Sequence, residues 1–295
     1  MELRISNLTK EFDGFKAVND VSYTMGCGVY GLLGVNGAGK TTLMRMLTTL
    51  MKPTSGEILW DGQNIFTMDG RYRMLLGYLP QDFGYYPDFT VLDYLLYIAS
   101  IKGIRPSVAK QRTKELLKQV GLTKARNKKM KTLSGGMKRR AGIAQAMLNN
   151  PKILILDEPT AGLDPSERIR FRNLISELAE DRIVLLSTHI VSDIEYIAND
   201  ILLMKDGQIT VSGTSEEIIA TMPDKVWRCT VPKGKIDAYL KAYKVSNVKT
   251  VSNGVELRIV AKNPPAENVI QETPTLEDVF LYYFGERAGG EDDTI

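Results

Sequence analysis

A glycine-rich stretch near residue 34 carries the residue types that bind a phosphate chain. The sequence GVNGAGKTT, residues 34–42, fits the pattern G-x-x-x-x-G-K-[ST], whose defined positions are Gly34, Gly39, Lys40 and Thr41. Glycines let backbone N–H groups turn toward phosphate oxygens, and a following helix adds the positive end of its dipole. We expect Lys40 to reach the β- and γ-phosphates of a bound nucleotide and Thr41 to hold Mg²⁺. The residues predicted to surround the nucleotide phosphates are Gly34, Val35, Asn36, Gly37, Ala38, Gly39, Lys40, Thr41 and Thr42.

Two acidic residues follow an apolar run later in the chain. In ILILDEPT, residues 153–160, Asp157 and Glu158 come directly after the apolar residues. Ligands of open α/β sheets bind outside the carboxyl ends of the strands, where these side chains would lie. We expect Asp157 to hold Mg²⁺, directly or through water, and Glu158 to act as the base for the attacking water. A helix cap is the alternative role for such acids, and the phosphate loop argues against it.

The chain contains a single histidine, His189, which comes soon after the apolar run at residues 183–186. Histidine changes its charge near neutral pH and therefore suits proton chemistry. A lone histidine in an arbitrary chain is more often a structural residue. Its position at the end of a buried strand leaves both interpretations open at this point.

The elements that must position these residues alternate between buried strands and helices. Continuous apolar strands are predicted over residues 28–34, 152–158 and 182–187, and helices over 40–50, 135–150 and 165–180. Ser134 is a good N-cap for the second helix, and Pro165 suits the first turn of the third. Apolar strands that alternate with helices predict an α/β fold with a parallel sheet covered on both faces.

Other patterns flank this core. The pairs Asp13-Gly14 and Asp61-Gly62 lie between apolar runs in the first 66 residues and predict hairpins, the second of them between GEILW and QNIF. Residues 82–150 have apolar residues at helical spacing, with helices that end at Gly103 and Gly121. After residue 222 the pattern becomes strand, helix, strand, tight turn, strand and closing helix. We therefore predict a main domain at 1–222, a small α+β domain at 223–287 and a disordered tail at 288–295.

Composition excludes several classes of protein. The 295 residues are 43% apolar and 25% charged, as in ordinary globular proteins, and a net charge of +3 does not indicate nucleic-acid binding. No acidic residue occurs from 116 to 156, which we interpret as a solvated basic surface, so no nucleic acid is expected. Two cysteines far apart fit a reducing compartment. The longest apolar runs fall far short of the ~18–20 residues that span a bilayer, so we expect no transmembrane segment.

The stretch TLSGGMKRRAGIAQAML, residues 132–148, is the most specific element. Ser134, Gly135 and Gly136 at a helix N-terminus predict a second phosphate site. The order of phosphate loop, Gln81, LSGG, LDEP and His189 resembles the nucleotide-binding domain of ABC ATPases over about residues 1–222. The resemblance implies a P-loop NTPase core with an N-terminal antiparallel β-subdomain, an inserted α-helical subdomain at about 82–150 and a small C-terminal α+β appendage.

The resemblance also implies roles for single residues. Phe12, in LTKEFDG, matches the aromatic residue that stacks on adenine, and Gln81 matches the glutamine that senses Mg²⁺ and links to the helical subdomain. Leu163 and Asp164, in AGLDP, match the loop that communicates across a dimer. His189 matches the histidine that contacts the γ-phosphate and steadies the attacking water with the base. The implied catalytic residues are Lys40, Glu158 and His189, and the implied Mg²⁺ ligands are Thr41, Gln81 and Asp157.

The LSGG segment matches the signature that meets the γ-phosphate of an ATP held by another subunit. The family pattern continues with Gln, whereas this chain has Met137, whose thioether cannot offer the hydrogen bonds of an amide. The role of that fifth position is therefore in doubt. One phosphate loop and one signature per chain imply that two chains meet head to tail across ATP, as a homodimer or a heterodimer.

The resemblance extends to partners. Tyr85, Tyr86 and Phe89 lie just after Gln81, where the family receives a coupling helix of a separate membrane permease. The ending PTLEDVFLYYFGE, residues 274–286, resembles ATPase subunits of bacterial drug, antibiotic and sodium exporters. We expect a peripheral protein on the cytoplasmic face of the membrane that uses ATP and Mg²⁺. The alternatives are a soluble ABC ATPase with a non-transport role and a P-loop kinase or GTPase. A kinase or GTPase is disfavoured because the LSGG signature is present and no N-K-x-D stretch, which reads guanine in GTPases, occurs in the sequence.

Overall fold

The computed structural model describes residues 1–285, which fall into two compact units. The first unit runs from Met1 to Val211, and the second begins at Ser212. The predicted domain boundary lies after residue 222, so the eleven residues 212–222 belong to the second unit by their contacts. The predicted tail at 288–295 lies outside the described residues.

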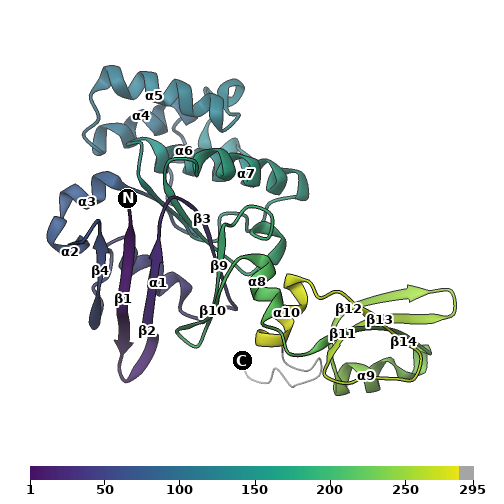
Figure 1. The fold of residues 1–295 in the computed structure, drawn as a ribbon. Coiled ribbons are helices and arrows are strands. Elements are labelled where there is room, and N and C mark those ends of the chain that lie inside the picture. The colour runs from purple at the N-terminus through teal and green to yellow at the C-terminus, as the bar shows by residue number, and fades with distance from the viewer. Residues whose placement is uncertain (286–295) are drawn as a thin grey trace. The chain divides into compact units, whose positions relative to one another are not determined.

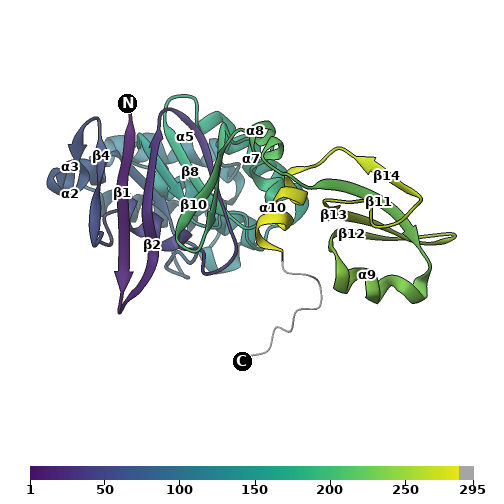
Figure 2. The ribbon, with the colours of Figure 1, turned by 60° about the horizontal axis from the view of Figure 1, so that its bottom comes forward.

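An antiparallel sheet opens the first unit. Its strands are β1 (Leu3–Phe12), β2 (Phe15–Met25), β4 (Ser55–Trp60) and β5 (Gln63–Asn64), in the order β2-β1-β4-β5. The long strands β1 and β2 lie side by side (Figure 1, Figure 2). They turn at Asp13-Gly14, where both residues have positive φ, as the first predicted hairpin requires.

The second predicted hairpin is shorter than expected. Gln63 and Asn64 pair with β4, but Ile65 and Phe66 begin the helix α2 (Ile65–Met68). The Asn64 side chain accepts a hydrogen bond from the Phe66 N–H at 3.0 Å and so caps the helix. The assignment of the whole QNIF segment to a strand was therefore wrong.

A second sheet of six strands forms the centre of the first unit. Its order is β10 (Gln208–Gly213), β9 (Asp200–Lys205), β3 (Gly28–Leu33), β8 (Ile183–Thr188), β7 (Ile153–Leu156) and β6 (Leu76–Leu79). The pairings from β9 to β6 are parallel, which confirms the predicted parallel sheet. β10 follows β9 after a two-residue turn, a connection that only antiparallel neighbours use.

Helix α1 (Lys40–Leu47) packs between the two sheets. Its buried residues Leu43, Met44, Met46 and Leu47 share one core cluster with the inner faces of both sheets. Leu3, Ile5 and Ile58 represent the antiparallel sheet in this cluster, and Leu32, Ile155 and Leu185 the central one. The core therefore holds the start of α1, and with it the phosphate loop, against the carboxyl end of β3.

The first unit contains further helices. They are α3 (Gly70–Leu75), α4 (Val91–Ile101), α5 (Pro106–Gln119), α6 (Gly135–Met147) and α7 (Pro165–Leu178), with short 3-10 turns at Thr123–Ala125, Met130–Thr132 and Val191–Asp193. Figure 1 shows α4 and α5 side by side beyond α6 and α7. The Ser134 hydroxyl caps α6, and Pro165 opens α7, as predicted. Within residues 1–285, no helix combines the length and apolarity needed to cross a bilayer.

The second unit is an α+β structure. Its elements are α8 (Ser215–Ala220), β11 (Lys225–Val231), a 3-10 turn at Lys233–Lys235, α9 (Ile236–Ala242), β12 (Lys244–Val251), β13 (Gly254–Ala261), β14 (Val269–Glu272) and α10 (Leu276–Phe284). The antiparallel strands have the order β12-β13-β11-β14, and the sequence had not indicated β14. Residues of α9 pack on a small core that includes Cys229, Leu257 and Ile259.

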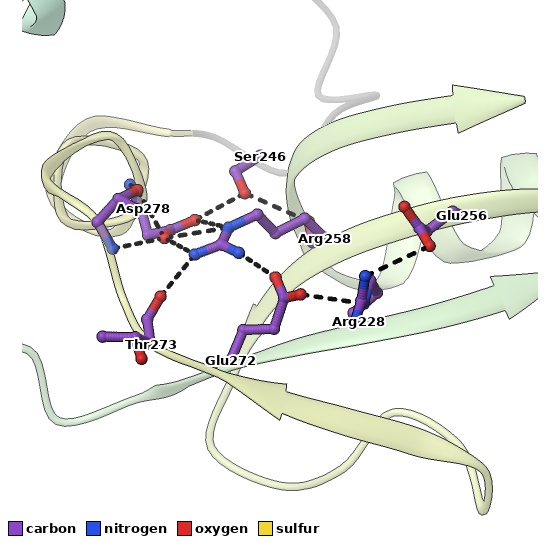
Figure 3. A network of polar contacts seen from close by, with 8 residues as sticks. Arg228, Ser246, Glu256, Arg258, Glu272, Thr273 and Asp278 are labelled. Carbon is purple, nitrogen blue, oxygen red and sulfur yellow. Dashed lines mark hydrogen bonds and ion pairs between the residues drawn. The ribbon is translucent and has the colours of Figure 1, made fainter.

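A polar network fastens α10 to this sheet (Figure 3). The fully buried Asp278 accepts hydrogen bonds from Arg258 Nη2 at 2.7 Å, from Ser246 Oγ at 2.7 Å and from the Thr275 N–H at 2.8 Å. Arg258 also pairs with Glu272. Burial by itself would raise the pKa of Asp278, but the bonds from Arg258, Ser246 and Thr275 outweigh it and lower the pKa. The LEDVF segment thus has a structural role as a capped, anchored helix.

This network predicts acid sensitivity of the second unit. Because the folded pKa of Asp278 is depressed, its stabilisation is complete above the unfolded pKa of about 3.9 and is lost as the pH falls through the lower folded value. We expect Asp278→Asn to lower the free energy of unfolding by about 3 kcal/mol at pH 7, because Arg258 loses a buried partner. Urea unfolding between pH 7 and 3 measures both effects. Glu277→Gln, at the exposed neighbouring position, is the control, and equal losses in the two variants would contradict the assignment.

Candidate active site

The glycine-rich segment joins the end of β3 to the start of α1. Gly37 and Gly39 have φ of 82° and 102°, values that side-chain-bearing residues rarely adopt. A Cβ atom on Gly39 would lie 2.2 Å from the carbonyl oxygen of Ala17, and one on Gly34 would lie 2.4 Å from that of Met204. Only glycine therefore fits at positions 34 and 39 of this loop.

A pocket of about 260 Å³ opens beside the loop. It is lined by Phe15, Ala17, Asn36, Gly37, Ala38, Gly39, Lys40, Thr41, Thr42, Gln81 and Glu158. The fold thus brings Gln81 and Glu158 to the loop from distant parts of the chain. Gly34 and Val35 do not line this pocket, although their carbonyl groups contact Lys40.

The aromatic side chain in the pocket wall is Phe15, which sequence reasoning did not single out. Phe12, the predicted adenine contact, is Phe15's partner across the hairpin, and its ring lies 5.1 Å from the Lys10 ammonium. Both phenylalanine side chains are exposed. The stacking role of Phe12 stays a prediction, and the exposed Phe15 beside the Asp13-Gly14 turn was the available signal for a second aromatic candidate.

Lys40 is buried among acceptors. Its Nζ donates to the carbonyl oxygen of Gly34 at 2.7 Å and to that of Val35 at 3.1 Å, and it lies 3.9 Å from Glu158 Oε1. Burial lowers the pKa of the ammonium group, whereas the nearby carboxylates of Glu158 and Asp157 act in the opposite direction. The arrangement places a cation at the floor of the pocket, where it can bind phosphate oxygens.

The two acidic residues after β7 are buried and lie beside this cation. The Asp157 N–H donates to the Leu79 carbonyl at 2.9 Å, which continues the β6–β7 pairing past the end of the strand. Glu158 has a φ of 46°, a left-handed conformation that is uncommon for a residue with a side chain. Glu158 Oε2 lies 3.1 Å from Nδ1 of His189. A carboxylate, an imidazole and an ammonium group therefore meet at one side of the pocket.

The side chains predicted to hold Mg²⁺ supply the oxygen donors that this ion prefers. Thr41 and Gln81 line the pocket with a hydroxyl and an amide, and Asp157 precedes the lining residue Glu158. Residues 1–285 contain no cluster of three His, Cys, Asp or Glu side chains arranged as a metal site. Magnesium does not need one, because it is usually held by one or two protein oxygens together with substrate phosphates. The residues present fit the ion.

The LSGG segment forms the N-terminus of α6. Ser134 Oγ accepts a hydrogen bond from the Met137 N–H at 3.3 Å, and Gly135 faces open space. At Gly136 a Cβ atom would lie 2.9 Å from the Glu167 carboxylate, so a larger residue would require the Glu167 side chain to move. Among the described residues that line the phosphate-loop pocket, none belongs to the range 134–136. Ser134 and Gly135 are instead exposed to solvent.

Comparisons with known proteins agree with this arrangement. The ABC transporter family model matches residues 18–161. The uncharacterized ABC transporter ATP-binding protein YxlF of Bacillus subtilis is 35% identical, over 95% of this chain and 98% of that protein. This chain belongs to the family of ABC transporter ATP-binding proteins. It is an ATPase of the ABC type, with the P-loop fold of that family.

Two further relatives of this ABC ATPase bear on its branch and assembly. The Nod factor export ATP-binding protein I of Burkholderia lata is 33% identical over 95% of each chain. A dimeric structure of a bacterial ABC transporter cassette matches with a TM-score of 0.66 and 26% identity, over 72% of this chain and 98% of that cassette. The family membership and the drug-exporter-like branch predicted from the sequence are confirmed.

Two other predicted residues of the ABC ATPase have local structural explanations. Asp164 is the N-cap of α7 and accepts hydrogen bonds from the Glu167 N–H at 2.9 Å and from Ser166 Oγ at 2.8 Å. These bonds lower the pKa of Asp164. Leu163 is buried. A role for either residue across a dimer stays a prediction, because the cap alone accounts for the aspartate.

Aromatic side chains gather on the surface after Gln81. Tyr86, Phe89 and Tyr97 form what we call the aromatic cluster: Tyr86 stacks on Phe89 with ring centroids 5.0 Å apart, and Tyr97 meets both edge-on. Tyr85 is not part of it and contacts Phe83 and Lys138 instead. Tyr97 lies in the same aromatic stretch of the sequence but was not among the three residues predicted to dock, and the fold packs it against Tyr86 from α4.

Proposed function

We propose that this ABC ATPase hydrolyses ATP to power export through a separate membrane permease. The observation that carries the proposal is that Glu158 and Lys40 line a pocket bounded by a phosphate-binding loop, while the His189 imidazole contacts the Glu158 carboxylate. The similarity to the Nod factor export protein favours the export direction. The alternative of a non-transport ABC ATPase gains no support from the proteins it resembles.

The proposed chemistry follows from the positions of the side chains. The loop N–H groups and Lys40 bind the phosphates, and Thr41, Gln81 and Asp157 would hold Mg²⁺, which supplies charge neutralisation at the phosphates. Glu158 removes a proton from the attacking water. His189, bonded to Glu158, holds that carboxylate and the water in position. Phe12 and Phe15 are the aromatic candidates for the adenine base.

We further propose that two nucleotide-binding subunits close over ATP. Ser134 and Gly135 are exposed and Gly136 is buried, and none of the three lines the pocket of its own chain. An exposed helix N-terminus with free N–H groups suits a phosphate presented by a second subunit. The dimeric cassette of similar fold supports this assembly. Because Glu158 and His189 are both present, two copies of this chain would form two equal active sites. A homodimer is therefore the proposed assembly, and a heterodimer with a related subunit is the alternative.

The permease is proposed to dock on the aromatic cluster together with Tyr85, which places the protein at the cytoplasmic face of the membrane. Tyr86 is 46% exposed, and Tyr97 is 38% exposed. Aromatic residues are enriched at protein interfaces because they bury much area with few rotatable bonds. Gln81 precedes these aromatic residues in the sequence and lines the pocket. Docking of the permease would therefore act on the pocket through Gln81.

Cross-linking and recovery of the native protein in gentle detergent tests the proposal. We expect a polytopic membrane protein to be recovered with the wild type and to be lost with Tyr86→Ala. Tyr196→Ala removes a tyrosine that is 76% exposed outside the cluster and serves as the control. Recovery of soluble partners only, with ATPase activity intact, would overturn the transport role and leave the hydrolysis chemistry standing.

A further inference from the structure

One buried hydroxyl lies between the two acidic residues of the site. Ser187 Oγ donates to Asp157 Oδ1 at 2.7 Å and accepts a hydrogen bond from the Glu158 N–H at 2.9 Å. Ser187 is fully buried and lies in β8, the strand next to β7. One side chain therefore touches the carboxylate of the first acid and the backbone of the second.

We propose that Ser187 is a positioning residue for ATP hydrolysis, which sets the metal-binding carboxylate and the catalytic base at the same time. The proposal rests on the roles of Asp157 and Glu158 proposed above. Ser187 makes no contact with a reacting group and acts only through these two neighbours.

The effect on Asp157 follows from the geometry of a hydroxyl. A serine hydroxyl has one proton to donate, and the Glu158 N–H occupies an acceptor site on Oγ. The proton is therefore directed at Asp157 Oδ1, which accepts it as a carboxylate. With Oδ1 held by this bond, the orientation of the Asp157 carboxylate is restricted. A hydrogen bond of this kind fixes the orientation of a metal ligand.

The effect on Glu158 acts through the backbone. Its φ of 46° lies in a region that side-chain-bearing residues populate only when neighbouring contacts hold them there. The bond from the Glu158 N–H to Ser187 Oγ is such a contact. The turned backbone directs the carboxylate toward His189, at 3.1 Å, and toward Lys40, at 3.9 Å. Loss of the Ser187 bond would allow the base to leave this position.

A second hydrogen bond also joins the segment that follows β7 to the segment that follows β8, so Ser187 is not needed to hold these two segments together. The Thr160 hydroxyl donates to Asp193, and both residues are buried. This bond joins the segment after Glu158 to the segment after His189, farther from the pocket-lining residues. The loops therefore stay together when Ser187 is changed, and the expected defect is a local misplacement of Asp157 and Glu158 and not unfolding.

Three variants test the proposal. Ser187→Ala removes the hydroxyl, and Ser187→Thr keeps it on a residue that suits a strand. Thr113→Val is the matched control, because Thr113 is buried with a hydroxyl that has no hydrogen-bond partner among the described residues. Four quantities are measured: kcat, KM for ATP, ATP affinity in EDTA, and the affinity for Mn²⁺ with ATP. The last is followed by electron paramagnetic resonance in a Glu158→Gln background, which separates binding from turnover.

We expect Ser187→Ala to lower kcat and the Mn²⁺ affinity, each by about 10- to 100-fold, the range found when a contact that orients a metal ligand is removed. ATP affinity in EDTA should stay within about twofold of the wild type, because Ser187 is not part of the phosphate loop that binds the nucleotide without a metal. Ser187→Thr should recover most of both losses. Thr113→Val should match the wild type throughout.

Two results would overturn the proposal. One is unchanged kcat and Mn²⁺ affinity in Ser187→Ala. The other is an equal loss of ATP affinity in EDTA, without recovery by Ser187→Thr, which would mean a general structural role. Failure of the underlying mechanism is distinguishable, because Glu158→Gln alone would then keep its turnover whatever the Ser187 variants do.

Discussion

The Glu158→Gln protein is expected to lose steady-state ATP hydrolysis while it still binds ATP. Glutamine keeps the shape of the side chain but cannot take a proton from water. General bases contribute roughly 10²–10⁴-fold to rate, which corresponds to about 3–5 kcal/mol of barrier. ATP binding should survive because the loop N–H groups remain, and Asp157 continues to favour the protonated form of Lys40.

Phosphate release under saturating ATP and Mg²⁺ measures the loss, and equilibrium binding of ATP checks that the pocket is intact. Glu180→Gln changes an exposed carboxylate near the end of α7 and is the matched control. If the dimer closes over ATP as proposed, the Glu158→Gln protein should also accumulate as an ATP-bound dimer in size-exclusion chromatography. Undiminished ATPase activity in this variant would contradict the assignment of Glu158 as the base.

The second large effect is expected from His189→Ala. The imidazole Nδ1 lies 3.1 Å from Glu158 Oε2, so its removal frees the carboxylate and leaves the water without a positioning group. We expect kcat to fall by about 10²–10⁴-fold with a small change in KM, since the phosphate loop does not depend on the histidine. Because the side chain is 51% exposed, truncation should not unfold the protein.

The double variant Glu158→Gln/His189→Ala separates a shared role from two independent ones. Residues that act as a unit show losses that do not add. We therefore expect the double variant to be about as slow as Glu158→Gln alone. Multiplication of the two single losses would show that His189 acts apart from Glu158. A His189→Ala protein with wild-type kcat would refute the catalytic role of the histidine altogether.

The local patterns of the sequence were sufficient for most elements of the fold. The apolar runs at 153–156 and 183–186 became β7 and β8, and the parallel sheet followed from their alternation with helices. The phosphate loop was recognisable because its glycines are required by the backbone itself, as the clash distances at Gly34 and Gly39 show. The strand and helix patterns depend on neighbours along the chain, whereas the glycine clashes involve the distant carbonyl oxygens of Ala17 and Met204.

Weakly patterned elements were harder to predict. The four-residue β6 and the edge strand β14 are too short for a clear alternation. Ile65 and Phe66 were assigned to a strand because they are apolar, but the Asn64 cap places them in a helix. The hairpin of β9 and β10 turns at Asp206-Gly207, a pair of the same kind as Asp13-Gly14 in the first hairpin. The sequence analysis did not predict this hairpin.

The sequence by itself determined which residues are proposed to bind phosphate and which acids and histidine are proposed to act beside them, and it predicted the helices and the parallel sheet that hold them. The tertiary structure alone decided the contacts between them. Ser187 meets Asp157 and Glu158 because the parallel register sets Leu156 beside Leu186. Phe15 lines the pocket, and Tyr97 packs against Tyr86, through tertiary packing. Such contacts depend on how separate segments pair and pack in three dimensions, which the residue pattern within one segment does not specify.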